Sequence, residues 1–167
     1  NAITDKSLYG HLAAGVPGSV DGMVKAHEKF GKLSWAEVVQ PALDLARKGF
    51  PITDSQVEEF TELQEGIKKY NPGKSYFIKE KWAKGDLWIQ EDLAKTLELI
   101  RDKGREGFYA GEVADHIEAE MKSGGGLISK EDLKNYQSQW REPLVGYYKE
   151  YKVITMPPTS SGGIALL

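Results

Sequence analysis

The sequence predicts a mainly α-helical bundle followed by a short C-terminal β-hairpin. Apolar residues recur at helical spacing through most of the first 133 residues. Residues 34–37 and 53–56 match the capping box that begins many helices. Near the C-terminus, residues 144–148 and 151–156 alternate in character on either side of a Lys-Glu turn, which is typical of a hairpin. Such a hairpin could begin a sheet that is completed by other polypeptide.

Two helices are expected in the first 49 residues. The first covers residues 20–30, and Gly31 ends it at the C′ position. The second begins with the Ser34 and Glu37 pair, whose hydroxyl and carboxylate each accept a hydrogen bond from an otherwise unpaired backbone N–H. Pro41 lies inside this second pattern. We expect it to kink the helix or to delay its regular part, because proline lacks a backbone N–H.

The middle of the chain alternates between helix and irregular structure. A helix beginning at the Thr53 and Gln56 capping box should end at the Asn-Pro-Gly sequence of residues 71–73. Residues 74–90 carry β-favouring side chains separated by charges, which indicates a long loop or a weak ribbon. Helix returns up to Gly104, another helix precedes the three glycines 124–126, and Ser129 caps a short turn.

Composition excludes several classes of protein. A chain of 167 residues can form one domain that buries about 68–70% of its unfolded surface. The net charge of −3 disfavours nucleic acid as a partner. No apolar run approaches the roughly 20 residues needed to span a bilayer. Cysteine is absent, which excludes disulfides, thiolate metal sites and cysteine nucleophiles.

Several polar groups could carry chemistry, but each has a structural explanation. The glycines 124–126 lack the Lys-Ser/Thr of a phosphate loop and fit a helix terminator better. The histidines lack metal-ligand spacing, and the paired carboxylates fit solvated helix faces or first turns. The tryptophans have no basic groove beside them and are expected in packing. These residues are His11, His27 and His116; Glu58, Glu59, Glu91, Asp92, Glu118 and Glu120; and Trp35, Trp82, Trp88 and Trp140.

The Ser-Ser-Gly-Gly sequence at residues 160–163 forms a predicted strand-to-helix junction. Such a junction exposes backbone N–H groups that can bind an anion or line a pocket. Alternatively, Ser160 or Ser161 caps the helix and the glycines allow close backbone approach. The segment lacks the Gly-x-Ser-x-Gly pattern of a nucleophile elbow, and no His/Asp partner for a serine triad is identifiable.

Several collinear blocks resemble the large subunit of the γ-glutamyltranspeptidases and cover nearly the whole chain. The blocks are residues 14–20, Trp35, 39–42, 46–50, 107–111, 125–128, 131–133, Tyr136, 141–143, Tyr148, 151–153, 156–158 and 160–163. Two departures are Glu150, where the family often turns on glycine, and Thr159, where it often has proline. Neither departure touches the chemistry.

The resemblance implies an N-terminal-nucleophile hydrolase, of which this chain would form a piece of the αββα architecture. In that family a precursor cleaves itself and exposes a threonine, which attacks γ-glutamyl amides such as glutathione with its own α-amino group as base. Backbone N–H groups hold the oxyanion, and an arginine holds the glutamyl carboxylate. The resemblance places the nucleophile beyond Leu167 and that arginine before Asn1. None of the threonines present matches the processing site, namely Thr4, Thr53, Thr61, Thr96, Thr155 and Thr159.

We therefore expect no catalytic, substrate-binding, metal-binding or cofactor-binding residue in this chain. The expected organisation is a tag remnant at residues 1–2, a helical domain at 3–140, and a hairpin with the start of the next helix at 141–167. The expected partners are the remainder of a large subunit, a small subunit and a γ-glutamyl substrate. Family resemblance implies a periplasmic or secreted location. The alternatives are part of a related acylase or polyglutamate-processing enzyme, or a free-standing helical interaction module.

Overall fold

The computed structural model describes residues 5–71 and 75–167. The expected tag remnant at residues 1–2, and the Pro-Gly pair expected to end a helix at 72–73, lie outside this part. The chain divides into two compact units, Asn1–Gln137 and Ser138–Leu167. We call them the helical unit and the hairpin unit. The domain boundary predicted after residue 140 stays a prediction about the complete protein.

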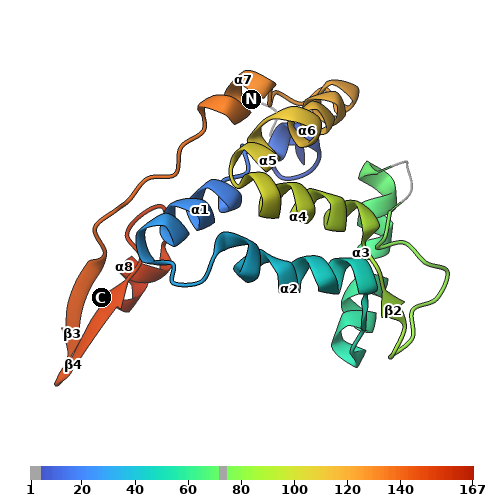
Figure 1. Ribbon diagram of the computed structural model, residues 1–167. Coiled ribbons are helices and arrows are strands. Elements are labelled where there is room, and N and C mark those ends of the chain that lie inside the picture. The colour runs from blue at the N-terminus through green and yellow to red at the C-terminus, as the bar shows by residue number, and fades with distance from the viewer. Residues whose placement is uncertain (1–4, 72–74) are drawn as a thin grey trace. The chain divides into compact units, whose positions relative to one another are not determined.

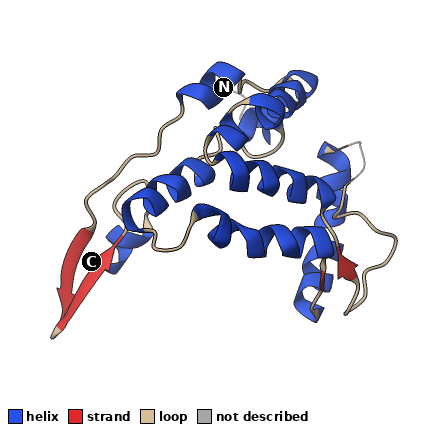
Figure 2. Ribbon diagram, in the orientation of Figure 1, coloured by secondary structure: helices blue, strands red, loops and turns tan. Residues whose placement is uncertain are grey.

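Helices make up most of the helical unit, as Figures 1 and 2 show. Its elements in chain order are η1 (Asp5–Ser7), η2 (His11–Ala13), α1 (Ser19–Phe30), α2 (Trp35–Lys48), β1 (Phe50–Pro51), α3 (Asp54–Tyr70), β2 (Leu87–Trp88), α4 (Glu91–Lys103), α5 (Glu106–Tyr109), α6 (Gly111–Gly124) and α7 (Lys130–Asn135). The mainly α prediction is confirmed. The four-residue helix α5 and the pairing of β1 with β2 were not predicted.

Local side-chain caps fix the start of three helices. Both predicted capping boxes are present, with Ser34 and Glu37 beginning α2 and Thr53 beginning α3. Ser129 forms a third capping box at the start of α7. Helix α2 begins at Trp35 and continues through Pro41, so the expectation that its regular part starts late is wrong. The alternative, a kink at Pro41, stays a prediction.

The core of the helical unit consists of three clusters. Figure 1 shows α2 and α4 side by side, and Leu43, Ala46 and Ala94 are buried between them. An aromatic cluster joins α3 to the loop that follows it. A third cluster holds α1, α4, α5, α6 and α7 together through Val20, Ile100, Tyr109, Ala114, Ile128 and Leu133.

The aromatic cluster explains why residues 75–90 form a long loop and not a separate ribbon. Ile52, Phe60 and Trp82 are buried there, and Trp88 packs against them. Strand β2 pairs antiparallel with β1, in the register Phe50 with Trp88. The β-favouring side chains of this segment therefore cover one end of α3 instead of building a larger sheet.

The hairpin unit contains β3 (Leu144–Tyr148), β4 (Tyr151–Thr155) and the short helix α8 (Gly162–Leu166). The strands pair antiparallel, with Tyr148 opposite Tyr151 across the two-residue turn. The predicted hairpin is confirmed, with β4 ending one residue earlier than the sequence pattern suggested. Lys149 adopts φ of 52°, the left-handed conformation that a tight hairpin turn requires of a central residue.

Candidate functional site

The best-organised polar cluster of the helical unit surrounds Asp21, whose side chain is 2% exposed in the first turn of α1. Arg105, at the N-cap of α5, donates from Nε to Asp21 Oδ1 at 2.7 Å. Lys25 Nζ lies 3.5 Å from the other carboxylate oxygen. The acid is thus held within the first turn of α1, where the helix dipole also favours negative charge.

Two stacked tyrosines complete this cluster. The Tyr109 hydroxyl donates to the carbonyl of Pro17 at 2.6 Å and accepts from the backbone N–H of Asp21 at 3.3 Å. The Arg105 guanidinium lies 4.6 Å from the Tyr109 ring centroid, and the Tyr136 ring stacks on the Tyr109 ring with centroids 5.9 Å apart. Burial raises the pKa of the Tyr109 phenol. The Asp21 carboxylate, the Arg105 guanidinium and the Tyr109 hydroxyl each have a protein partner, so we assign this cluster to holding α1, α5 and α7 together.

A cleft lies where the loop after α3 meets β2 and the first turn of α4. Its volume is about 650 Å³, and its lining mixes aromatic, aliphatic and charged side chains. The lining residues are Ser75, Tyr76, Ile78, Lys79, Trp82, Leu87, Trp88, Ile89, Glu91 and Asp92. Tyr76 donates to Asp92 at 3.0 Å, and this hydrogen bond raises the pKa of the tyrosine.

The histidines lie on separate elements. His11 Nε2 is 2.7 Å from Glu120 Oε1, which ties η2 to α6. His27 Nε2 lies 2.9 Å from the carbonyl oxygen of Leu33, so His27 bridges the end of α1 and the turn before α2. His116 lines a groove beside α4. Within residues 5–71 and 75–167, no group of three or more histidine, aspartate or glutamate side chains is arranged to hold a metal ion.

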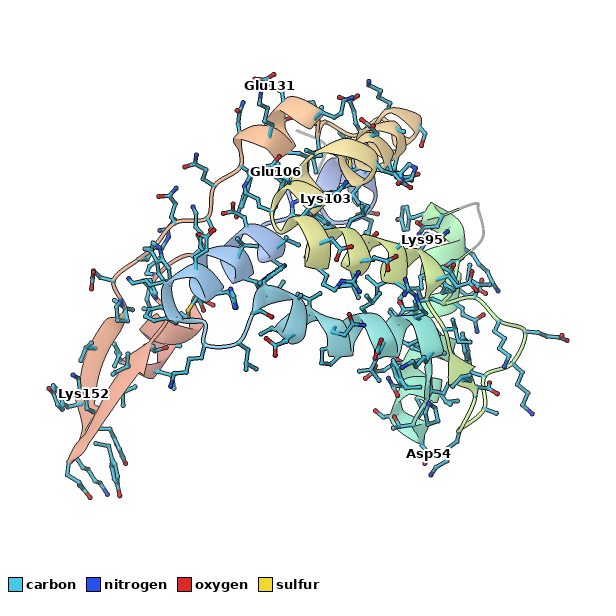
Figure 3. The ribbon with its side chains drawn as sticks, viewed as in Figure 1. Asp54, Lys95, Lys103, Glu106, Glu131 and Lys152 are labelled. Carbon is cyan, nitrogen blue, oxygen red and sulfur yellow. The ribbon has the colours of Figure 1, made fainter. Side chains whose placement is uncertain are left out.

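Several of the other carboxylates and tryptophans have local partners. Glu118 accepts from Lys122 Nζ at 2.7 Å, and this hydrogen bond lowers the pKa of Glu118. Lys95, labelled in Figure 3, donates to Asp92 at 3.2 Å on the surface of α4. The Trp35 indole donates to the carbonyl of Ile100 at 2.7 Å. These contacts fit the structural explanations given for these residue types.

The Ser-Ser-Gly-Gly segment begins α8, as the strand-to-helix prediction requires. Ser161 is at the N-cap position, but no side-chain capping hydrogen bond forms, so the expected serine cap is absent from this helix. Gly163 is buried, and a Cβ placed there would lie 2.0 Å from the carbonyl oxygen of Met156. The expected close backbone approach is therefore present at Gly163. Close packing therefore explains why position 163 is glycine, but it does not explain Gly162.

The comparisons with known proteins decide the family. The family model for gamma-glutamyltranspeptidase matches residues 1–167. The chain belongs to the γ-glutamyltranspeptidase family. The similarity inferred from separate sequence blocks therefore extends over the whole chain.

Individual γ-glutamyltranspeptidase relatives agree with this assignment. The glutathione hydrolase proenzyme of Escherichia coli (strain K12) is 43% identical and covers 100% of this chain, which spans 29% of that relative's length. The crystal structure of Helicobacter pylori gamma-glutamyltranspeptidase superposes with a TM-score of 0.93 at 46% identity, covering 99% of this chain and 48% of that one. The Acylase ACY 1 proenzyme of Pseudomonas sp. (strain V22) is 35% identical over 95% of this chain and 29% of its own length.

Two features of this γ-glutamyltranspeptidase chain were missed by sequence reasoning. Asp21 and Arg105 are 84 positions apart, and neither stands out among 25 acidic and 22 basic residues. The cleft was missed because its aromatic residues were assigned to packing alone. Trp82 and Trp88 do pack in the aromatic cluster, but they also line the cleft. The sequence signal that could have indicated the cleft is the mixture of charged and aromatic residues over 76–92.

Among the described residues, the structure contains no helix with the length and apolar character needed to span a membrane.

Proposed function

We propose that this chain is part of the large subunit of a γ-glutamyltransferase/hydrolase that cleaves γ-glutamyl amides such as glutathione. The similarity to the Helicobacter pylori enzyme over 99% of the chain carries this proposal. The relatives' designation as proenzymes supports a precursor that cleaves itself. The chain spans 29% of the length of the Escherichia coli proenzyme, and we place the nucleophilic threonine in the polypeptide that this chain does not include.

In this proposal the described residues act as scaffold. The capped helices and the Asp21–Arg105 cluster hold the helical unit together. The hairpin supplies strands to a sheet that the rest of the enzyme completes. The threonine hydroxyl of the small subunit attacks the γ-glutamyl carbonyl, its α-amino group takes the proton, and water or an amine resolves the acyl-enzyme. No residue of this chain is assigned to a reacting atom.

The test compares the 167-residue chain with the full-length precursor, using γ-glutamyl-p-nitroanilide as donor. The precursor should separate into two subunits on a denaturing gel and release p-nitroaniline. The isolated chain should release none above buffer. Turnover by the isolated chain would show that the nucleophile has been assigned to the wrong polypeptide, and an unprocessed, inactive precursor would contradict the proposed activity.

A second candidate is a related acylase or polyglutamate-processing enzyme, favoured by the 35% identity to an acylase proenzyme. The higher identity to the glutathione hydrolase ranks it second. The processed precursor can be offered γ-glutamyl, glutaryl and poly-γ-glutamyl donors in parallel. A rate that is highest with glutaryl or polymeric donors would replace the first candidate with the second.

The partners and location follow from the same proposal. We propose that the chain assembles with the remainder of the large subunit and with a small subunit, and that the enzyme is periplasmic or secreted. Fractionation of cells expressing the native gene, followed by immunoblotting, checks the location. Recovery of the processed enzyme only in the cytosolic fraction would contradict it.

A further inference from the structure

One part of the helical unit, made of β1, α3, the loop after α3 and β2, has a core of its own. We call residues 50–71 and 75–88 the α3 segment. Its buried apolar side chains are Ile52, Phe60 and Trp82, which pack together with the half-buried side chains of Val57, Phe77 and Trp88. None of these six residues belongs to either of the other two clusters of the helical unit. The segment therefore buries its apolar residues against itself.

The polar contacts between α3 and its loop also stay inside the α3 segment. The buried amide of Gln64 accepts from the backbone N–H of Lys79 at 3.0 Å. The backbone N–H of Ile52 donates to the carbonyl of Asp86 at 3.0 Å, and its carbonyl accepts from the N–H of Gly85 at 2.9 Å. These bonds join the two ends of the segment to each other, so the loss of one part removes partners of the other.

The α3 segment is attached to the rest of the helical unit by few contacts. Within the described parts of the chain, one side-chain hydrogen bond joins them, from the Tyr76 hydroxyl to Asp92 at 3.0 Å. The Tyr70 ring stacks on the Tyr9 ring with centroids 5.8 Å apart. Strands β1 and β2 pair with each other, so the chain enters and leaves the segment at neighbouring points.

Packing around the α3 segment is incomplete. A groove of about 650 Å³ separates its loop from the first turn of α4, and another of about 500 Å³ lies between α3, η2 and α6. Of the 17 residues of α3, Phe60 and Gln64 are buried. The Trp82 Nε1 is buried without a hydrogen-bond partner among the described residues, which destabilises the folded form of the segment. Regions with few buried contacts open at lower free energy than a core.

We propose that the α3 segment is a separately opening unit: it unfolds locally and as a whole while α2 and α4 stay packed. The hydrogen bond from Tyr76 to Asp92 is the latch that favours its closed form. Opening removes the wall that the loop contributes to the 650 Å³ cleft and exposes the first turn of α4. The inference uses contacts of the helical unit alone and does not depend on the proposed γ-glutamyl chemistry.

Native-state hydrogen exchange of the 167-residue chain, read by NMR, tests the proposal. The amides of α3 report on the helix, and those of Ile52 and Gly85 report on the hydrogen bonds between the ends of the segment. All of them should share one opening equilibrium constant, at least about tenfold larger than that of the amides in α2 and α4. Equal constants in α3, α2 and α4 would overturn the proposal.

A matched pair of cap variants tests whether the segment opens as one unit. Thr53→Ala removes the oxygen that accepts from the Gln56 N–H at the start of α3. It should raise the opening constant about fivefold throughout the segment, at Gly85 as well as in α3. Ser34→Ala removes the same cap from α2, and it should leave exchange in the segment unchanged. A Thr53→Ala effect confined to α3, or a Ser34→Ala effect of equal size in the segment, would overturn the proposal.

Tyr76→Phe tests the latch while keeping the aromatic ring. The loss of one exposed hydrogen bond should raise the opening constant of the segment about twofold to fivefold and leave α2 and α4 unchanged. Tyr151→Phe, which removes an exposed hydroxyl from the hairpin unit, is the control and should change neither. If Thr53→Ala does not fold, Tyr76→Phe still tests the shared opening, because its effect must also appear at Ile52 and Gly85. An effect of Tyr76→Phe no larger than that of Tyr151→Phe would overturn the assignment of the latch.

Discussion

Replacing Arg105 with methionine tests whether the buried ion pair holds the helical unit together. The substitution removes the 2.7 Å hydrogen bond to Asp21. It also removes the donation from Nη2 to the carbonyls of Lys134, at 3.1 Å, and Tyr136, at 2.7 Å. Methionine keeps an unbranched stem that can still pack on Tyr109. The variant therefore removes charge and hydrogen bonds more than volume.

The expected loss is about 3 kcal/mol of unfolding free energy. Removing one partner of a buried pair costs about 3–5 kcal/mol, because the other charge stays buried. The Asp21 side chain is 2% exposed, but that of Arg105 is 25% exposed, and Lys25 remains 3.5 Å from the carboxylate. Both facts favour the lower end of the range. At roughly 2–4 °C per kcal/mol, the unfolding midpoint should fall by roughly 6–12 °C.

Urea denaturation followed by circular dichroism measures this loss. The matched control is Arg47→Met, which breaks a 2.9 Å pair with Glu98 whose side chains are 48% and 40% exposed. An exposed pair contributes about 0–1 kcal/mol. In the double variant with Asp21→Asn, the Arg105 substitution should cost less, because no buried charge is left. A loss from Arg105→Met no larger than that from Arg47→Met would refute the reasoning.

Two further predictions concern a close backbone contact and a surface ion pair. Gly107→Ala should destabilise the chain by about 2 kcal/mol, because a Cβ there would lie 2.0 Å from the carbonyl oxygen of Leu99. Gly66→Ala, in open space on α3, should stabilise the chain by about 0.5–1 kcal/mol. A urea midpoint that is higher for Gly107→Ala than for Gly66→Ala would contradict both expectations. The hydrogen bond from Lys79 lowers the pKa of Asp86 below 3.8, so its contribution to stability is present above that pH and is lost as pH falls through the folded-state pKa. Asp86→Asn should therefore flatten the fall in urea midpoint on acidification, and an unchanged pH profile would count against it.

The elements that sequence predicted well carry their signals locally. Helices α2 and α3 begin where a serine or threonine is followed three residues later by Glu37 or Gln56. Both partners of each cap lie within one helical turn. The hairpin is similar, since Tyr148 and Tyr151 face each other across a two-residue turn. Patterns of this range can be recognised without knowing the rest of the fold.

The elements that sequence missed depend on distant partners. Strand β1 exists because Phe50 pairs with Trp88, which lies 38 residues later in the chain. Helix α5 has four residues, too few to show a periodic pattern. Pro41 shows the opposite case, where a local signal for a late helix start was overridden by packing of α2 against α4. The cleft likewise requires the loop after α3 to fold back onto α4, which no local pattern specifies.

Helix α7 combines both kinds of signal. It has six residues, far below the roughly 12–15 at which an isolated helix becomes marginally stable in water. At its N-terminus, Ser129 and Asp132 form a cap that the local sequence contains. At its C-terminus, the carbonyls of Lys134 and Tyr136 accept hydrogen bonds from Arg105, about thirty positions earlier. The last carbonyls of a helix need such outside donors. The start of α7 was therefore readable from sequence, whereas its end depends on the same guanidinium that neutralises Asp21.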